Sequence, residues 1–165
     1  MNSRFAFSLT AAALSLGLAA CSTVSLDDPN GSGSGSSGSS SGGIMDPFNP
    51  NSPLAKDRSV YFEFDSFTVQ EQYRPTVENH ARYLSANPRQ NVVIEGNTDV
   101  RGGSEYNLAL GHRRAEAVRR MMTLMGANDQ QIETISLGKE KPRNPGNTDA
   151  AHAENRRADI VYTRQ

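Results

Sequence analysis

Cysteine, histidine and tryptophan are scarce in this sequence, and their scarcity excludes several kinds of site. The 165 residues include one cysteine, three histidines and no tryptophan. One cysteine cannot form an internal disulfide framework, and it cannot supply a cysteine-rich zinc site. His80, His112 and His152 have no metal-ligand or catalytic motif around them. We therefore expect no metal, no cofactor and no enzyme activity.

The chain also lacks an excess of charge of either sign. It has 17 basic and 18 acidic residues, whereas a domain that binds nucleic-acid phosphates usually carries a large basic excess. We therefore expect no nucleic-acid partner. The length fits one domain, or one small domain with extensions.

The first 21 residues have the pattern of an export signal. The apolar stretch from about Leu9 to Ala20 is too short, and too rich in Ala and Ser, for a membrane span. We interpret residues 1–20 as a signal peptide. The sequence Leu-Ala-Ala-Cys at its end, with Cys21 last, resembles the lipobox of bacterial lipoproteins. The alternative is an ordinary signal followed by a chance cysteine.

The lipobox resemblance implies acyl groups on Cys21, a diacylglyceryl thioether and an N-linked chain such as palmitate. Two or more acyl chains anchor a protein stably, whereas one chain does so only marginally. Ser22, rather than Asp, follows the cysteine. By resemblance to bacterial lipoproteins, this implies sorting to the outer membrane.

Residues 21–57 are expected to form a lipidated start and a flexible tether. Gly31 to Gly43 is a run of thirteen Gly and Ser residues, which cannot bury enough surface to fold. A proline-rich stretch with Pro47, Pro50 and Pro53 follows. We expect the tether only to separate the anchor from a folded domain over residues 58–165. A domain of that length can fold without disulfides or metals.

Hydrophobic periodicity and turn residues predict alternating strands and helices in the domain. A helix is expected to begin near Pro75 and to end before Asn87 and Pro88. The other predicted elements are strands over Val60–Phe64, Val92–Ile94, Ile132–Leu137 and Ala158–Tyr162, a long helix over Glu105–Met125 and a short one over Ala150–Asn155. The order β-α-β-α-β-(α)-β predicts an α/β two-layer sandwich, with helices on one face of a small mixed sheet.

The long predicted helix carries a charged residue on its apolar side. At about 100° per residue, Arg114 falls near the middle of an arc of Leu, Ala, Val and Met residues, and Asn107 falls there too. A charge on a core face is costly unless it is paired. Arg114 therefore needs either a structural acidic partner or a ligand, and the sequence leaves both open.

A polar turn follows the second predicted strand. It runs from Glu95 to Asp99 and is followed by Gly102 and Gly103. Ligand-binding groups concentrate on loops at strand ends, although the alternative is a plain turn in which Asp99 caps the next segment. If the helix brings Arg114 back to Asp99, the pair would suit a zwitterion, with its ammonium at the carboxylate and its carboxylate at the guanidinium.

Five segments of the chain together resemble the OmpA-like peptidoglycan-binding domain. The resemblance covers nearly all of residues 58–165 and implies the OmpA-like fold. Asn97 departs from the family pattern, because many members have His there, but it keeps a short polar side chain. The segments are Tyr61-Phe62-Glu63-Phe64-Asp65-Ser66, Glu95-Gly96-Asn97-Thr98-Asp99-Val100-Arg101-Gly102, Glu105-Tyr106-Asn107-Leu108-Ala109-Leu110-Gly111, Arg113-Arg114-Ala115 and Asn155-Arg156-Arg157.

The family resemblance implies a role for several of these residues. Asp99 and Arg114 are expected to grip the diaminopimelate of the peptidoglycan stem peptide. Phe64 and Asp65 are expected to line the same pocket, with backbone N–H groups offered to a carboxylate. Arg156 is expected to contact the ligand. Two further residues, Asn97 and Asn107, are expected to be structural polar groups near the site.

The resemblance also implies a non-enzymatic lipoprotein of the outer membrane whose domain faces the periplasm. The implied partners are peptidoglycan of the diaminopimelate type, the outer-membrane bilayer through acylated Cys21, and TolB with the rest of the Tol complex. The implied role is envelope integrity and cell division. The alternatives are an OmpA-like lipoprotein without a Tol partner, or the docking module of a wall-remodelling factor.

Overall fold

The computed structural model describes residues 45–164, in which strands and helices alternate in the predicted order. A short helix, α1 (Pro53–Lys56), precedes the first strand, and the 3-10 turns η2 (Glu71–Tyr73) and η3 (Asp129–Gln131) lead into α2 and β3. The remaining elements are β1 (Ser59–Tyr61), α2 (Arg74–Ala86), β2 (Val92–Asn97), α3 (Ser104–Leu124), β3 (Ile132–Gly138), α4 (Asp149–Asn155) and β4 (Arg157–Tyr162).

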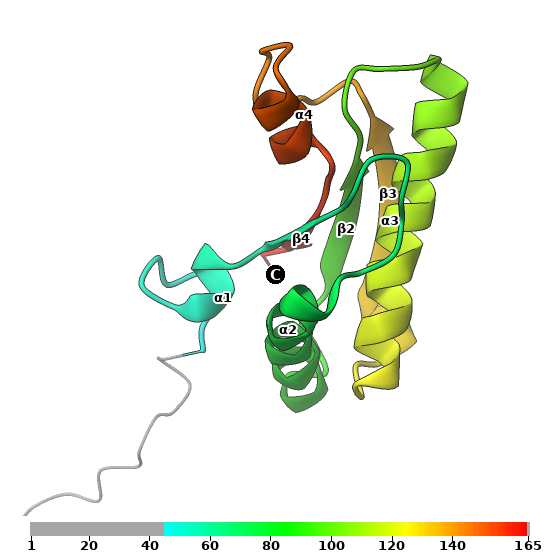
Figure 1. The fold of residues 1–165 in the computed structure, drawn as a ribbon. Coiled ribbons are helices and arrows are strands. Elements are labelled where there is room, and N and C mark those ends of the chain that lie inside the picture. Colours follow the sequence, from blue (N-terminus) through cyan, green and yellow to red (C-terminus); the bar gives the residue numbers. More distant parts are fainter. Residues whose placement is uncertain (1–44, 165) are drawn as a thin grey trace, which may run out of the picture. The chain divides into compact units, whose positions relative to one another are not determined.

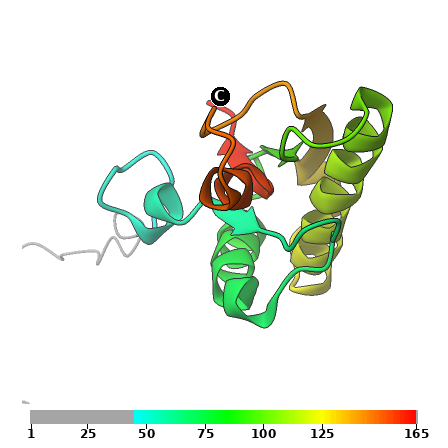
Figure 2. The ribbon, with the colours of Figure 1, turned by 45° about the horizontal axis from the view of Figure 1, so that its top comes forward.

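The four strands form one mixed sheet in the order β1-β4-β2-β3. β4 is antiparallel to both β1 and β2, whereas β2 and β3 are parallel and are joined by the long helix α3. α2 and α3 lie side by side over the sheet (Figure 1, Figure 2) and pack on each other. The predicted two-layer α/β class is therefore confirmed.

The hydrophobic core lies between the sheet and these two helices. α2 contributes Val77, Ala81 and Leu84, all fully buried. Burying a Val or Leu side chain is worth about 1.5–3 kcal/mol. The other main core residues are Val60, Phe62, Val92, Ile94, Ala115, Val118, Met122, Ala127, Ile132, Ala158, Ile160 and Tyr162.

The first strand is shorter than the sequence predicts, and the difference creates a loop. β1 ends at Tyr61 rather than Phe64, and Phe62 is the last residue that still bonds toward β4, through the carbonyl of Arg156. Asp65 then has a positive φ of 56°, in the left-handed region that side chains other than Gly rarely adopt. The chain consequently leaves the sheet at residues 63–66 and passes in front of α3.

The folded domain includes residues before the predicted boundary at residue 58. Ser52 caps α1 by accepting a hydrogen bond from the Leu54 amide, and the Leu54 side chain is 1% exposed. The Phe48 ring packs edge-on against Tyr162, with centroids 6.3 Å apart. Residues 45–57 are therefore not tether, because their few apolar side chains find a place on the domain. The signal peptide, Cys21 and the Gly/Ser run lie outside the described residues.

Within residues 45–164, no helix has both the length and the apolar character that a membrane span needs.

Two residues of the predicted apolar arc of α3 remain at the surface. Leu108 is 46% exposed, and Leu124, the last residue of the helix, is 87% exposed. The arc is therefore narrower at both ends of α3 than in its middle.

His80 joins the early segment to the core through a buried hydrogen-bond chain. Its Nε2 lies 2.9 Å from the Asp57 carbonyl, which can only accept, so Nε2 carries the proton. Its Nδ1, 2.8 Å from the Tyr162 hydroxyl, must then accept. Burial lowers the pKa of His80 from 6.5 to about 4, with the nearby Arg58 acting in the same direction and Asp57 opposing both. The ring is therefore neutral in the folded protein at pH 7.

We expect this histidine to make the fold sensitive to mild acid. The unfolded chain takes up the proton below about pH 6.5, whereas the folded chain does so only near pH 4. Between these values the unfolded state binds more protons, so stability falls as the pH falls. The expected loss from His80 is roughly 2–3 kcal/mol between pH 7 and pH 4.5. Urea melts at several pH values should show a steeper loss for the wild type than for His80→Gln; parallel curves would contradict the assignment.

Candidate functional site

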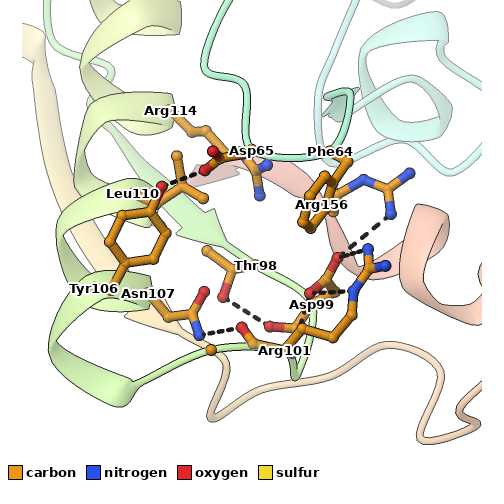
Figure 3. A pocket seen from close by; sticks show the side chains of 11 residues that line it. Phe64, Asp65, Thr98, Asp99, Arg101, Tyr106, Asn107, Leu110, Arg114 and Arg156 are labelled. Carbon is orange, nitrogen blue, oxygen red and sulfur yellow. Dashed lines mark hydrogen bonds and ion pairs between the residues drawn. The ribbon is translucent and has the colours of Figure 1, made fainter.

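A cavity of about 190 Å³ opens where the connection after β2, the 63–66 loop, the N-terminal half of α3 and the end of α4 meet. Figure 3 shows the side chains that surround it. Its charged lining comprises two carboxylates, Asp65 and Asp99, and three guanidinium groups. The full lining is Phe64, Asp65, Thr98, Asp99, Arg101, Gly102, Tyr106, Asn107, Leu110, Arg114 and Arg156.

The close packing of α3 on β2 brings Asp99 and Arg114 to this cavity. Asp99 lies two residues beyond the end of β2, and Arg114 lies in the middle of α3, which runs back along the sheet (Figure 1). The two backbones approach so closely that a Cβ at Gly96 would lie 1.8 Å from the Gly111 carbonyl oxygen. Glycine at both positions therefore permits the contact on which the geometry of the site depends.

Arg114 is fully buried and is held by backbone carbonyl groups. Its Nε donates to Ser66 O at 2.8 Å, Nη1 to Asn97 O at 2.8 Å and Nη2 to Glu63 O at 3.2 Å. Within the described part of the chain it forms no ion pair, so the alternative of a structural acidic partner is wrong. Three carbonyl oxygens satisfy this buried charge, and they tie the 63–66 loop to the end of β2.

Two of the five N–H groups of Arg114 stay available after these three hydrogen bonds, one on each terminal nitrogen. Burial lowers the pKa of Arg114 to about 10, and the neighbouring Arg156 acts in the same direction, while Asp99 and Asp65 oppose it. Arg114 therefore remains charged at neutral pH. It can offer a positive charge and two donors to an anionic group in the cavity.

Tyr106 of α3 also holds the 63–66 loop in place. The Tyr106 hydroxyl donates a hydrogen bond to Asp65 Oδ1, and this bond raises the pKa of Tyr106. Asp65 is the residue with the left-handed backbone conformation. Such strained residues cluster at ligand sites because the surrounding structure must hold them. Here Tyr106 and Arg114 do so together.

Asp99 is almost completely buried, with a side chain 6% exposed. Arg101 Nη2 lies 2.6 Å from its Oδ2, and Arg156 Nη1 lies 3.4 Å from the same oxygen. Burial alone would raise the pKa of Asp99, but the hydrogen bonds from Arg101 and Arg156 outweigh it, so the pKa lies below its ordinary value. Asp99 is therefore an anion at neutral pH.

The structure brings most of the predicted site residues to one place. Six of them, Phe64, Asp65, Asp99, Asn107, Arg114 and Arg156, line the cavity. Asn107 also donates its side-chain amide to the Arg101 carbonyl at 2.8 Å. Asn97 is not part of the lining; it supplies its carbonyl to Arg114, and its side-chain amide donates to the Glu95 carbonyl.

Sequence reasoning did not single out several lining residues. Arg101 and Tyr106 stand inside the family segments, but a surface arginine in a glycine-rich turn and a tyrosine in the first turns of a helix carry no signal of their own. Thr98, Gly102 and Leu110 complete the lining.

In residues 45–164 no group of three or more His, Cys, Asp or Glu side chains is placed to hold a metal ion.

Comparison with known proteins assigns the chain to a family. The family model described as "OmpA family" matches residues 61–156, which include all the lining residues. The peptidoglycan-associated lipoprotein of Pasteurella multocida is 39% identical over 88% of this chain and 89% of its own length. That of Haemophilus influenzae is 38% identical over 96% of this chain and 99% of its own length. The chain belongs to the peptidoglycan-associated lipoproteins of the OmpA family.

Solved structures agree with this membership. The crystal structure of the peptidoglycan-associated lipoprotein from Burkholderia pseudomallei is 58% identical, covers 71% of this chain and 98% of its own, and superposes with a TM-score of 0.69. The C-terminal domain of Helicobacter pylori MotB, at 21% identity and a TM-score of 0.60, covers 65% of this chain and 84% of its own. That second likeness shows the OmpA-like fold alone.

Proposed function

We propose that the domain binds peptidoglycan non-covalently and that the cavity takes the zwitterionic end of a diaminopimelate side chain. The observation that carries this proposal is the meeting of a buried carboxylate, Asp99, with the buried guanidinium of Arg114 in one cavity. The free end of diaminopimelate carries an ammonium and a carboxylate on one carbon. The ammonium suits Asp99, and the carboxylate suits the free donors of Arg114 with the backbone amides of Phe64 and Asp65.

The size of the cavity fits only a small charged group of a ligand. Its volume of about 190 Å³ is below the roughly 300–1,000 Å³ of sites that enclose a drug-sized ligand. The end of one amino-acid side chain fits such a space, whereas the rest of a stem peptide would lie outside it. The exposed rings of Phe64 and Tyr106 flank the opening (Figure 3).

Stem peptides that differ at one residue test this function. A peptide with lysine in place of diaminopimelate keeps the ammonium but lacks the distal carboxylate. We expect it to bind roughly tenfold to a hundredfold more weakly, because each hydrogen bond to a charged group is worth about 1.5–3 kcal/mol. Asp99→Asn should weaken the binding of the diaminopimelate peptide by a similar factor.

Calorimetry on the purified full-length protein in detergent measures both differences. Asp159→Asn is the control, because Asp159 is another partly buried carboxylate with arginine partners, Arg143 and Arg157, and it lies outside the cavity lining. Its binding should match that of the wild type. Equal affinities for the two peptides would refute the assignment of the cavity to diaminopimelate.

We further propose that the protein is a non-catalytic outer-membrane lipoprotein, anchored through acylated Cys21 and working with TolB and the Tol complex in envelope integrity and cell division. The lipobox-like sequence supports the anchor, and membership of the peptidoglycan-associated lipoproteins supports the partner. In this arrangement residues 1–20 are the removed signal peptide, and the Gly/Ser-rich tether ends before residue 45. Palmitate labelling that is lost in Cys21→Ser tests the anchor, and co-purification tests TolB.

A further inference from the structure

The carboxylate of Asp99 is fully engaged by donors of the protein itself. A carboxylate offers about four lone-pair positions, and Asp99 accepts four hydrogen bonds. Oδ1 accepts from the backbone amide of Arg101 at 3.1 Å and from its Nε at 3.3 Å. Oδ2 accepts from Arg101 Nη2 at 2.6 Å and from Arg156 Nη1 at 3.4 Å. An ammonium group can therefore reach Asp99 only if one of these donors leaves.

The two arginines differ in how firmly they are held. Arg156 is 13% exposed, and its Nε donates to the Phe62 carbonyl at 3.0 Å, so it is fixed to the end of β1. The Arg101 side chain is 42% exposed, and in the described part of the chain all its side-chain hydrogen bonds go to Asp99. Its other contact is the ring of Phe64, 4.3 Å from the guanidinium and itself 61% exposed.

The position of Arg101 in the chain also allows it to move. It stands in the connection between β2 and α3 rather than in a helix or strand, and it precedes Gly102, whose positive φ of 87° turns the backbone. When Arg101 leaves, its partly exposed guanidinium returns to water, whereas the buried charge of Asp99 needs another cation in its place. Arg156 stays at Asp99, and the ammonium of the ligand can supply the second cation. Moving Arg156 instead would break its hydrogen bond to the Phe62 carbonyl.

We propose that Arg101 is a built-in competitor at the ammonium position of the cavity, which the ligand displaces from Asp99. The proposal rests on the function inferred above. The Arg101 guanidinium holds Asp99 charged and oriented until the ligand ammonium replaces its two side-chain hydrogen bonds. The binding of a simple amine only exchanges one cation at Asp99 for another, so it adds no new ion pair. A zwitterion also brings a carboxylate to Arg114, so the exchange favours zwitterions over plain amines.

Replacing Arg101 should consequently tighten binding rather than weaken it. Arg101→Gln keeps the stem over Phe64 but removes the cation that competes for Asp99. We expect the diaminopimelate stem peptide to bind about threefold to tenfold more tightly to this variant. The lysine peptide should gain at least as much, so the preference for diaminopimelate should not rise. The matched control is Arg119→Gln, which removes a two-pronged arginine–Asp129 pair outside the cavity and should leave both affinities unchanged.

Calorimetry on the full-length proteins, with melting curves to check the fold, gives these affinities. A direct readout is the Arg101 Nε–H resonance in ¹⁵N NMR, which should be observable without peptide and lost to solvent exchange at saturation. Weaker or unchanged binding by Arg101→Gln, or a resonance that persists at saturation, would overturn the proposal while leaving the peptidoglycan function intact. If neither the wild type nor the variant binds either peptide, both the function and the competitor role fall. Binding by the variant alone would support the competitor role.

Discussion

Gly96→Ala should destabilise the domain by about 3 kcal/mol or more. The added Cβ would lie 1.8 Å from the Gly111 carbonyl oxygen and 2.6 Å from its carbonyl carbon. Both are backbone atoms, so no side chain can rotate away to relieve the clash. α3 must move off β2, and overpacking of a tight core contact costs about 1–3 kcal/mol, occasionally more. The same movement would carry Arg114 and Tyr106 away from the cavity, so peptide binding should weaken as well.

Denaturant unfolding of the two proteins measures this effect. Gly103→Ser is the matched control, since it enlarges a glycine in the same β2–α3 connection where no atom lies within 4 Å of the added Cβ. Gly103 is also the N-cap of α3, a position at which Ser is favoured. Its stability should be unchanged or slightly higher. If Gly96→Ala and Gly103→Ser unfold at the same denaturant concentration, the packing of α3 on β2 does not depend on this close approach.

The close approach at Gly96 and Gly111 also shows where sequence reasoning reached its limit. Periodicity predicted the helix α3 and the strand β2, because each buries a regular pattern of side chains. It placed Arg114 on the core face for the same reason. The pattern could not show how near the two elements lie, since that depends on atoms that glycine lacks. The meeting of Asp99 and Arg114 was thus a hypothesis until the packing was known.

The loop over residues 63–66 could not be predicted for a related reason. The aromatic run from Tyr61 to Phe64 has the composition of a strand, and β1 was expected to continue to Phe64. The carbonyl groups of Glu63 and Ser66 instead accept hydrogen bonds from Arg114, which is about fifty residues further along the chain. Long-range hydrogen bonds therefore outweigh the local strand preference. The family resemblance indicated that Phe64 and Asp65 line a pocket, but only the structure shows how they are held.

In residues 45–57 the error is the reverse, because a tether was predicted where the chain packs on the domain. The proline and asparagine content of this segment suggested a continuation of the tether, and composition alone gives that answer correctly for chains with no apolar side chains to bury. Leu54 and Phe48 are enough to change the outcome, because the domain offers them Tyr162 and the surface of α2. Two apolar residues in a polar stretch carry too weak a signal to overrule the average composition.

Arg114→Lys should lower both stability and peptide binding, because Arg114 holds the 63–66 loop as well as facing the cavity. Arginine spreads its donors over a planar fork and reaches three carbonyl oxygens on two separate segments. Lysine keeps the positive charge but offers one compact ammonium, which cannot reach all three oxygens from the same stem. At least one buried carbonyl then loses its partner, at a cost of about 1–3 kcal/mol. We expect the domain to be destabilised by about 2–4 kcal/mol.

The binding loss in Arg114→Lys follows from the same geometry. The 63–66 loop is held to β2 through Arg114, so loosening the loop misplaces the amides that would receive the ligand carboxylate. Asp99→Asn breaks a buried ion pair but leaves these three hydrogen bonds in place, so the loop should stay held in that variant while binding falls. Amide hydrogen exchange at residues 63–66 should be faster in Arg114→Lys than in Asp99→Asn. Together with urea melts and calorimetry, it separates the two cases. If Arg114→Lys melts like the wild type and still loses binding, Arg114 acts on the ligand alone and does not hold the loop in place.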